Sequence, residues 1–588
     1  MAESVYLRSG PPYPLATMPR AQARAFLLYV GVDPVNFGAY EGQGYLLALT
    51  PFDALQALDI VGPPYPCGTM PRRKARTTVS QGKAVTIYPA ATGNAARSSA
   101  NNDTPAATWV PGKLSGAFNY EISIFSGGDP TQGGTSTVGI LELIDPDGEL
   151  DSLRTLGWDG APVELRRGTP EAAFNSYSTV ARLSTAGLRY STRKKEVLLR
   201  DLAWQLTQAE LHGQRYGGTG AADGDAALVG IIKPIVLGEV FNITPTLINA
   251  NSLIYQVSCT SVLAVYSVKD GGAALAATTD YPTYAALAAA VIAPGYFGTC
   301  NALGLFKIGA APVYIITADV SGDNDTINGI AYPHTRASIA RRIATGRGNI
   351  RLSDPANIDS SSFEYLEQYQ SATIGYFWNS DITKADALSE VMAGCLGWWT
   401  VRLSGQLAVG QLEDPSAAAP VFSLAYPSAA MAGESRVDEP AMTDYRPPRR
   451  STLMGWSRNY TPLSTNQIAG SIAVTPTLNA IYQQASRYTT SEDLWVAAGY
   501  PSSPVVSVSG GFVSESAAAL EGNRQMRLLR TRRDVFEVPA VLDPFGDYAG
   551  RIIGITDAQR LGLGASWRGF CFGVAVNGGA KITLKLWG

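Results

Sequence analysis

The sequence predicts a multidomain, mainly β protein with α+β units. The chain has 588 residues, more than one hydrophobic core normally serves, so several domains are expected. Charged residues make up only 16% of it, while glycine occurs 60 times and tyrosine 28 times. Tyrosine favours strands and glycine favours turns, so this composition indicates short strands joined by many turns.

The segment 139–201 shows this pattern most clearly. Residues 140–145 alternate in the way typical of a half-buried strand, and Pro146, which has no N–H, ends it. The Asp-Gly pairs at 147–148 and 159–160 are turn signals, and the leucines between them have helical spacing for one or two turns. A second strand is expected directly afterwards, and the segment contains no catalytic constellation.

The clearest predicted helix begins at Thr383, whose hydroxyl caps it while Asp386 completes a capping box. Gly397 is expected to end this helix. A hairpin with a Ser-Gly turn follows over 401–409, so helix and hairpin are expected to form one α+β unit. The apolar stripe predicted to pack on the hairpin's sheet consists of Leu388, Val391, Met392, Cys395 and Leu396.

Three further elements are expected. A short helical stretch occupies 283–293, and a longer helix starts at Ser514 and runs to about Arg533. The C-terminal residues 581–588 alternate as a half-buried strand, with Ile582, Leu584 and Leu586 on its apolar face.

Two stretches of unusual composition stand apart from these elements. The pattern GPPYPxxTMPRxxAR occurs at 10–24 and again at 62–76, and its prolines favour a stiff, polyproline-like backbone with a tyrosine anchor. Two interpretations remain open: equivalent rigid turns of a duplicated β module, or a docking arm for a neighbouring subunit. Residues 92–108 predict an exposed loop, and the glycine-rich residues 216–224 predict a flexible hinge.

Composition excludes several classes of function. With 46 basic and 49 acidic residues, the net charge of −3 gives no reason for stable nucleic-acid binding. Cys67, Cys259, Cys300, Cys395 and Cys571 are far apart and never form a CxxC pair, which predicts neither a zinc site nor a disulfide framework. No signal peptide and no transmembrane segment are expected, because the start is not a charged and then apolar leader and the apolar run near 285–293 is too short.

No catalytic, cofactor-binding or metal-binding residue is predicted, and the chain is expected not to be an enzyme. His212 and His334 have no second histidine or cysteine at ligand spacing. The acidic stretches DPDGELD at 145–151 and DVSGDND at 319–325 alternate oxygen ligands but do not match an EF-hand, so turns are expected at both, with calcium at the second as the alternative.

Three other chemical possibilities are weaker. A glycosidase needs only two carboxylates, but the sequence does not single out any pair of acidic residues for this role. The 216–224 loop lacks the Lys-Ser/Thr of a P-loop. An arginine cluster is expected on a solvated or subunit-facing helix side, with nucleic acid as the alternative; it consists of Arg524, Arg527, Arg530, Arg532 and Arg533.

The order of several motifs resembles the hub proteins at the tail tip or baseplate of tailed bacteriophages and gene-transfer particles. These motifs are YLLALTPFD at 45–53, the segment 139–201 described above, YGGTGAADG at 216–224, KPIVLGEVFNITPTLI at 233–248, LIYQV at 253–257, the helix and hairpin described above, and the final LWG. The resemblance covers most of the chain, but residues 1 to about 44 precede the usual opening. It implies tube-like β-barrel domains in a ring, usually three copies that each contribute two barrels.

On this resemblance, the chain is divided into five segments. They are N-terminal strands with the duplicated element at 1–76, a first hub β-barrel domain at 77–215, an inserted β-rich domain at 216–335, a second α+β hub domain at 336–510, and a helix with closing strands at 511–588.

The resemblance implies a structural hub subunit that joins the tail tube and distal tail ring to a central fibre or spike. A homotrimer is expected, with a distal tail protein, a tape-measure protein and a central fibre or spike protein as partners, located in the virion after assembly in the bacterial cytoplasm. Two alternatives remain: a receptor-binding or adhesin tail protein, distinguished by binding to host cells or glycans, and a tail-associated cell-wall hydrolase, distinguished by peptidoglycan clearing.

Overall fold

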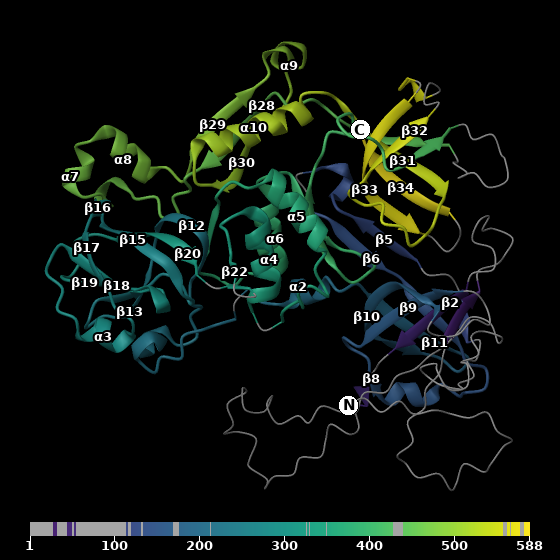
Figure 1. Ribbon diagram of the computed structural model, residues 1–588, viewed down its shortest axis with the longest axis horizontal. Helices are drawn as coiled ribbons and strands as arrows, with labels where there is room; N and C mark the ends of the chain where they lie inside the picture. Colours follow the sequence, from purple (N-terminus) through teal and green to yellow (C-terminus); the bar gives the residue numbers. More distant parts are fainter. Residues whose placement is uncertain are drawn as a thin grey trace, which may run out of the picture.

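Strands dominate the structure, and the fold is mainly β with α+β units, as expected (Figure 1). The computed structural model describes residues 28–31, 44–49, 52–53, 113–115, 119–130, 133–168, 176–211, 213–324, 326–327, 330–348, 350–426, 439–556, 561–564, 566–576 and 581–588. Both Pro-rich repeats and the 92–108 segment lie outside these residues. The described residues form four packed parts.

The first sheet is antiparallel, has seven strands and curls until its edge strands β1 and β4 contact each other. The alternation predicted around 140–145 is confirmed, because Leu141 and Leu143 are buried while Ile140 and Ile144 are exposed. In spatial order the strands are β1 (Leu28–Gly31), β2 (Gly44–Leu49), β9 (Pro162–Gly168), β10 (Ser178–Tyr190), β11 (Lys194–Arg200), β7 (Ile140–Ile144) and β4 (Leu114–Ser115). Around it lie β3 (Phe52–Asp53), β8 (Leu156–Gly157), the 3-10 helix η6 (Asp151–Thr155) and α2 (Trp204–Gln208).

The closing sheet has eight strands and takes them from both halves of the chain. The predicted C-terminal strand is confirmed: Ile582, Leu584 and Leu586 are fully buried in one apolar core. In spatial order, six of its strands are β26 (Ser423–Ala425), β32 (Ile552–Thr556), β33 (Ser566–Val576), β34 (Lys581–Trp587), β31 (Arg533–Val541) and β27 (Ala441–Arg446). The other two are β5 (Tyr120–Ser123), which pairs with β33, and β6 (Thr135–Val138), which pairs with β5. The 3-10 helix η5 (Ser126–Gly128) connects β5 to β6 in the chain. The five-segment division stays a prediction, and this sheet joins strands from its second, fourth and fifth segments.

A β sandwich occupies the opposite side of the molecule (Figure 1). Its two five-stranded sheets enclose one apolar core, in which the rings of Tyr255 and Phe306 stack with centroids 5.2 Å apart. One sheet contains β16 (Ala273–Ala274), β15 (Val262–Asp270), β20 (Ile316–Asp323), β12 (Ile235–Ile243) and β23 (Gly375–Trp378). The other contains β13 (Thr246–Asn249), β14 (Ile254–Gln256), β19 (Leu305–Ile308), β18 (Tyr296–Cys300) and β17 (Ala276–Asp280), with α3 (Tyr284–Ala289) packed outside it. Near it lie η8 (Ala221–Asp223), η9 (Ala226–Leu228), η10 (Asn301–Leu303), β21 (Thr326–Ile327) and β22 (Ile330–Ala331).

The helical unit lies between the sandwich and the two curled sheets (Figure 1). It shares β23 with the sandwich: Phe377 points into the sandwich core, while Tyr376 and Trp378 belong to the helical core. The unit contains α4 (Arg336–Gly346), α5 (Ser360–Tyr369), α6 (Lys384–Ala393) and the hairpin β24 (Gly397–Val401) and β25 (Leu407–Gln411). Above it, α10 (Glu515–Leu529) packs on a three-stranded sheet of β28 (Ser451–Trp456), β29 (Arg487–Glu492) and β30 (Val505–Phe512). The loops that connect these strands contain η11 (Thr465–Gln467), α7 (Gly470–Ala473), α8 (Pro476–Gln483) and α9 (Leu494–Gly499).

The predicted Thr383 cap and the packing of α6 are confirmed, but the predicted end of the helix is not. In place of the predicted capping box, the Asp386 carboxylate accepts the Thr383 hydroxyl at 2.7 Å. The Thr383 hydroxyl accepts a bond from the Asp386 N–H, and Leu388 is fully buried in the core that contains the hairpin. The helix ends at Ala393 rather than at Gly397, because Leu396 takes a left-handed φ of 48° and turns the chain into β24. Leu396 therefore packs in a different core.

The other two predicted helices are also shorter than expected. The helix that Ser514 caps ends at Leu529, because Arg533 already begins β31. The stretch expected over 283–293 is helical only to Ala289, after which the chain is extended at Ala290. Within the described residues, none of the helices is both long and apolar enough to cross a membrane.

Candidate functional site at the junction of the parts

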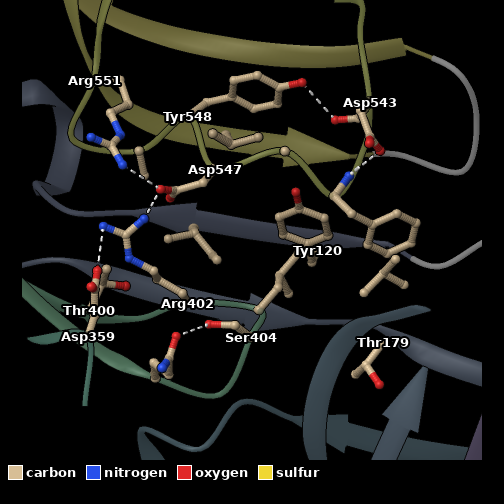
Figure 2. Close-up of a pocket in the computed structure, with 18 of the residues that line it drawn as sticks. Tyr120, Thr179, Asp359, Thr400, Arg402, Ser404, Asp543, Asp547, Tyr548 and Arg551 are labelled. Atoms are coloured by element: carbon tan, nitrogen blue, oxygen red, sulfur yellow. Dashed lines mark hydrogen bonds and ion pairs between the residues drawn. The ribbon is translucent and has the colours of Figure 1, made fainter. Parts of the chain in front are cut away.

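A polar cavity of about 480 Å³ lies where the first sheet, the helical unit and the closing sheet meet. The hairpin β24–β25, the ends of β9 and β10, and the loop between β31 and β32 bring its side chains together (Figure 2). The main polar residues that line it are Tyr120, Arg167, Asp359, Arg402, Asp543, Asp547, Tyr548 and Arg551.

Arg402 connects two of the three parts. It follows β24, and its guanidinium lies between the carboxylates of Asp359 and Asp547 (Figure 2), with 3.0 Å to Asp359 Oδ2. Arg551 reaches the same Asp547 Oδ2 at 3.1 Å. Burial lowers the pKa of Arg402, while the charge of Asp359 acts in the opposite direction. The guanidinium remains a cation and acts as a clamp, because arginine stays protonated in proteins.

Arg167 at the end of β9 makes the second connection. Its two terminal nitrogens bind the two oxygens of Asp543 at 2.7 and 2.9 Å, which is a bidentate geometry. Asp543 also accepts the Phe545 N–H at 3.0 Å, and its carbonyl accepts the Tyr548 hydroxyl at 3.0 Å. The loop after β31 is therefore held both by its own hydrogen bonds and by the Arg167–Asp543 pair, which attaches it to the first sheet.

Tyr120 on β5 and a backbone bond complete the junction. The Tyr120 hydroxyl donates to the carbonyl of Pro544, and burial raises the pKa of this phenol well above its usual value, so it stays a donor. The Arg182 N–H on β10 donates to the Leu403 carbonyl of the hairpin turn at 2.6 Å.

This arrangement is suited to holding the parts together. Asp359, Asp543 and Asp547 are each paired with a guanidinium, and none of the described residues around the cavity is a histidine or cysteine that could serve as a base or thiol nucleophile. Among the residues that the structure describes, no group of three His, Cys, Asp or Glu side chains could hold a metal ion.

The two acidic stretches have different outcomes. The turn predicted at 145–151 is confirmed: Asp145 accepts the Leu150 N–H at 3.1 Å, and Gly148 has a φ of 73°. Asp145 is fully buried and lies 3.0 Å from Lys195 Nζ and 3.9 Å from Lys113 Nζ.

The turn predicted at 319–325 is wrong, because Asp319 and Asp323 lie on strand β20. Asp319 accepts the Asn242 N–H at 2.8 Å and pairs with Lys269 Nζ at 2.5 Å. Asp323 pairs with two buried guanidinium groups, those of Arg342 and Arg347. Both carboxylates are thus engaged by cationic side chains, and Asp325 lies outside the described residues.

The histidines and cysteines do not come together. His334 is partly buried, and desolvation lowers its pKa, while His212 lies outside the described residues. Cys259, Cys300, Cys395 and Cys571 are free thiols in different parts of the fold, and Cys67 lies outside the described residues.

Two members of the arginine cluster have internal partners rather than a solvated or subunit-facing position. Arg524 binds Glu521 within α10 at 2.7 Å and donates to the Leu412 carbonyl at 2.9 Å. Arg533 lies 3.4 Å from Asp414 Oδ1 and donates to the Leu528 carbonyl.

The glycine-rich residues 216–224 form a hydrogen-bonded loop, and the hinge expected there stays a prediction. Asp223 accepts bonds from Gly217 N–H, Thr219 and Lys233, and these bonds lower its pKa to about 2. The buried Tyr216 hydroxyl donates to Gln256 at 2.6 Å.

The junction residues were not found by sequence analysis. Arg167 and Asp543 are separated by 376 positions, and neither stands in a motif. No sequence signal marks such pairs, because only the packing of distant segments brings them within bonding distance.

No protein-family model matches the chain, and no curated protein matches its sequence. Solved structures do resemble it. A tail protein from Neisseria meningitidis MC58 is 12% identical, with 80% of this chain and 91% of that one covered and a TM-score of 0.31. A chain of a native gene transfer agent virion is 13% identical, with 61% and 84% covered and a TM-score of 0.34.

A 43 kDa tail protein of prophage MuSo2 from Shewanella oneidensis is 8% identical, with 81% and 96% covered and a TM-score of 0.27.

Proposed function

We propose that this chain is a structural hub subunit of a phage-type tail tip or baseplate. The observation that carries the proposal is that two curled sheets, an antiparallel one of seven strands and a mixed one of eight, lie next to each other within one chain (Figure 1). Three such chains around an axis would present six curled β units, which is the number that a six-fold tube requires. The motif resemblance found in the sequence supports the same arrangement.

The junction supports this role. In a ring, each chain must keep its two curled sheets at a fixed angle, because a change in that angle would prevent the ring from closing. The Arg167–Asp543 and Arg402–Asp547 pairs connect the closing sheet to the first sheet and to the helical unit. The function proposed for the junction is therefore rigid spacing of the two curled sheets.

The surface offers groups for partner contact. Trp495 and Leu494 on α9 are 88% and 74% exposed, and exposed tryptophan is enriched at the energetic centres of protein interfaces. We propose that the partners are two further copies of this chain, the distal tail protein, the tape-measure protein and a central fibre or spike. In this proposal the role is structural rather than catalytic, and the chain assembles in the host cytoplasm.

Cryo-electron microscopy of the intact particle tests the proposal. We expect three copies in a ring at the tail tip, with the first sheet and the closing sheet alternating around the axis. Density for this chain away from the tail tip, or as a single copy on a fibre, would overturn the hub assignment and favour the receptor-binding alternative.

A further inference from the structure

A second hollow lies between the β5–β6 hairpin, α2 and α6. Two adjoining cavities, of about 410 and 300 Å³, share Gly133, Gly134, Ser389 and Trp399 in their linings and so form one groove. Among the described lining residues, it shares only Thr400 with the junction cavity. We refer to it as the tryptophan groove, because Trp204, Trp398 and Trp399 line it.

Two polar atoms in the wall of this groove lack a partner. Asp201 Oδ2 and Trp204 Nε1 are both buried, and neither has a hydrogen-bond partner among the described residues. The other oxygen of Asp201 accepts the Ala203 N–H at 3.1 Å. A buried polar atom without a partner costs free energy, so an acceptor and a donor that both belong to the lining of one cavity indicate a polar ligand that satisfies them.

The aromatic walls are held in position before any ligand arrives. The Arg200 guanidinium stacks on the Trp204 ring at 4.0 Å. The Trp399 indole N–H donates to the Ser389 hydroxyl at 3.0 Å, and this hydroxyl donates in turn to the Ala385 carbonyl at 2.8 Å. Fixed indole rings reduce the entropy that ligand binding costs.

The charges of the lining restrict the class of ligand. Asp201, Asp386 and Glu390 line the groove, and no lysine or arginine is among its described lining residues. Phosphates and other anions would be repelled, and the near absence of large aliphatic side chains around Asp201 disfavours an apolar guest. A sugar ring fits these groups: its hydroxyls can donate to Asp201 and accept from Trp204, and its C–H face can lie on an indole.

We propose that the tryptophan groove binds an uncharged glycan, with Asp201, Trp204 and Trp399 as the principal contacts. Such a site would let the chain hold a bacterial cell-wall or surface polysaccharide without cleaving it. The proposal stands on the groove itself and does not depend on the hub role. Burial raises the pKa of the Asp201 carboxyl, while the Ser136 hydroxyl and the Ala203 N–H act in the opposite direction.

Calorimetric and tryptophan-fluorescence titrations of the full chain test the proposal. The probes are a chitotetraose, which has the N-acetylated sugars of cell walls, and a maltotetraose, which has the plain hexoses of many surface polysaccharides. We expect one of them to bind with a dissociation constant of about 1 mM or tighter, and the preferred probe indicates the source. We expect Asp201→Asn to weaken binding about tenfold, because it removes the unpaired acceptor.

A second variant and two controls complete the test. Trp399→Phe keeps an aromatic ring and should weaken binding about fivefold. Trp495→Phe and Asp444→Asn change exposed residues outside the groove and should leave affinity within about twofold of the parent. The proposal is overturned if neither sugar binds, or if Trp399→Phe and a folded Asp201→Asn both bind as the parent does.

Discussion

Arg167 and Asp543, which are 376 positions apart in the chain, form a bidentate ion pair with nitrogen–oxygen distances of 2.7 and 2.9 Å. Their side chains are 17% and 22% exposed, so solvent screens the pair only in part. The pair connects strand β9 of the first sheet to the loop after β31 of the closing sheet. It therefore fixes how the first sheet and the closing sheet lie against each other.

Removing this pair should weaken the contact between the sheets. We expect Arg167→Ala and Asp543→Ala each to lower the free energy of unfolding by about 1 kcal/mol, with a favourable coupling of about 0.5 kcal/mol or more in the double-mutant cycle. The measurement is denaturant unfolding at low and high salt, and the coupling should shrink in 1 M NaCl. Additive single effects at low salt would show that the pair does not join the sheets energetically.

The buried stripe of α6 allows a sharper test of the core. Leu388→Asp should cost several kcal/mol and abolish soluble assembly, because Leu388 is fully buried in an apolar core that would desolvate the new carboxylate. Leu520→Asp is the matched control, since Leu520 lies on α10 and is 72% exposed. Soluble expression and thermal unfolding are measured, and a Leu388→Asp chain as stable as the control would contradict the packing described for α6.

Lys384 predicts a pH dependence of stability. Its ammonium is fully buried at the start of α6 and donates to the carbonyls of Ala344 and Ile350, and burial lowers its pKa to about 8 from 10.5. Between these two pH values the unfolded chain binds this proton and the folded chain does not, so the free energy of unfolding rises with pH across that window.

Comparison with Lys384→Met isolates this effect. Relative to the variant, the free energy of unfolding of the parent should increase by about 3 kcal/mol from pH 8 to pH 10.5 and should be constant below pH 8. Chemical denaturation across this range provides the measurement. A difference that does not change with pH would show that Lys384 titrates normally in the folded state.

Asp323 should be a structural counter-ion rather than a calcium ligand. Asp323→Asn leaves the buried guanidinium groups of Arg342 and Arg347 without their carboxylate, so the free energy of unfolding should fall by about 3 kcal/mol or more. Thermal unfolding of the parent should be the same in calcium and in EDTA. A calcium-dependent rise in melting temperature that Asp323→Asn abolishes would identify a metal site instead.

Trp495 tests the proposed assembly. Trp495→Ala should leave the melting temperature of the isolated chain nearly unchanged, because the side chain is 88% exposed, but it should lower the incorporation of the chain into particles at least about fivefold. Quantitative mass spectrometry of purified particles gives this ratio. Normal incorporation would exclude α9 from the assembly contacts.

Local elements were predictable wherever one short segment carries its own signal. The cap at Thr383, the hairpin around Gly405 and the alternation of residues 581–588 depend on neighbours only a few positions apart. The ends of helices were less predictable. The α6 helix stops before Gly397 because Leu396 adopts a left-handed conformation, which the propensity of leucine does not indicate.

The acidic stretch at 319–325 was also not predictable from its local sequence. The sequence around 319–325 is rich in turn-forming residues, yet Asp319 and Asp323 lie on strand β20 because Lys269, Arg342 and Arg347 neutralise them there. None of these three cations is adjacent to the strand in sequence, so no local pattern could place them.

The sequence by itself determined the mainly β class, the caps and the apolar faces, because these follow from periodicity and turn chemistry within about ten residues. Only the tertiary structure decided which strands share a sheet and which charges meet. The strand β5 pairs with β33, and Arg167 finds Asp543, across more than half of the chain. Such contacts depend on how whole sheets pack, and the junction and the tryptophan groove exist only after that packing is complete.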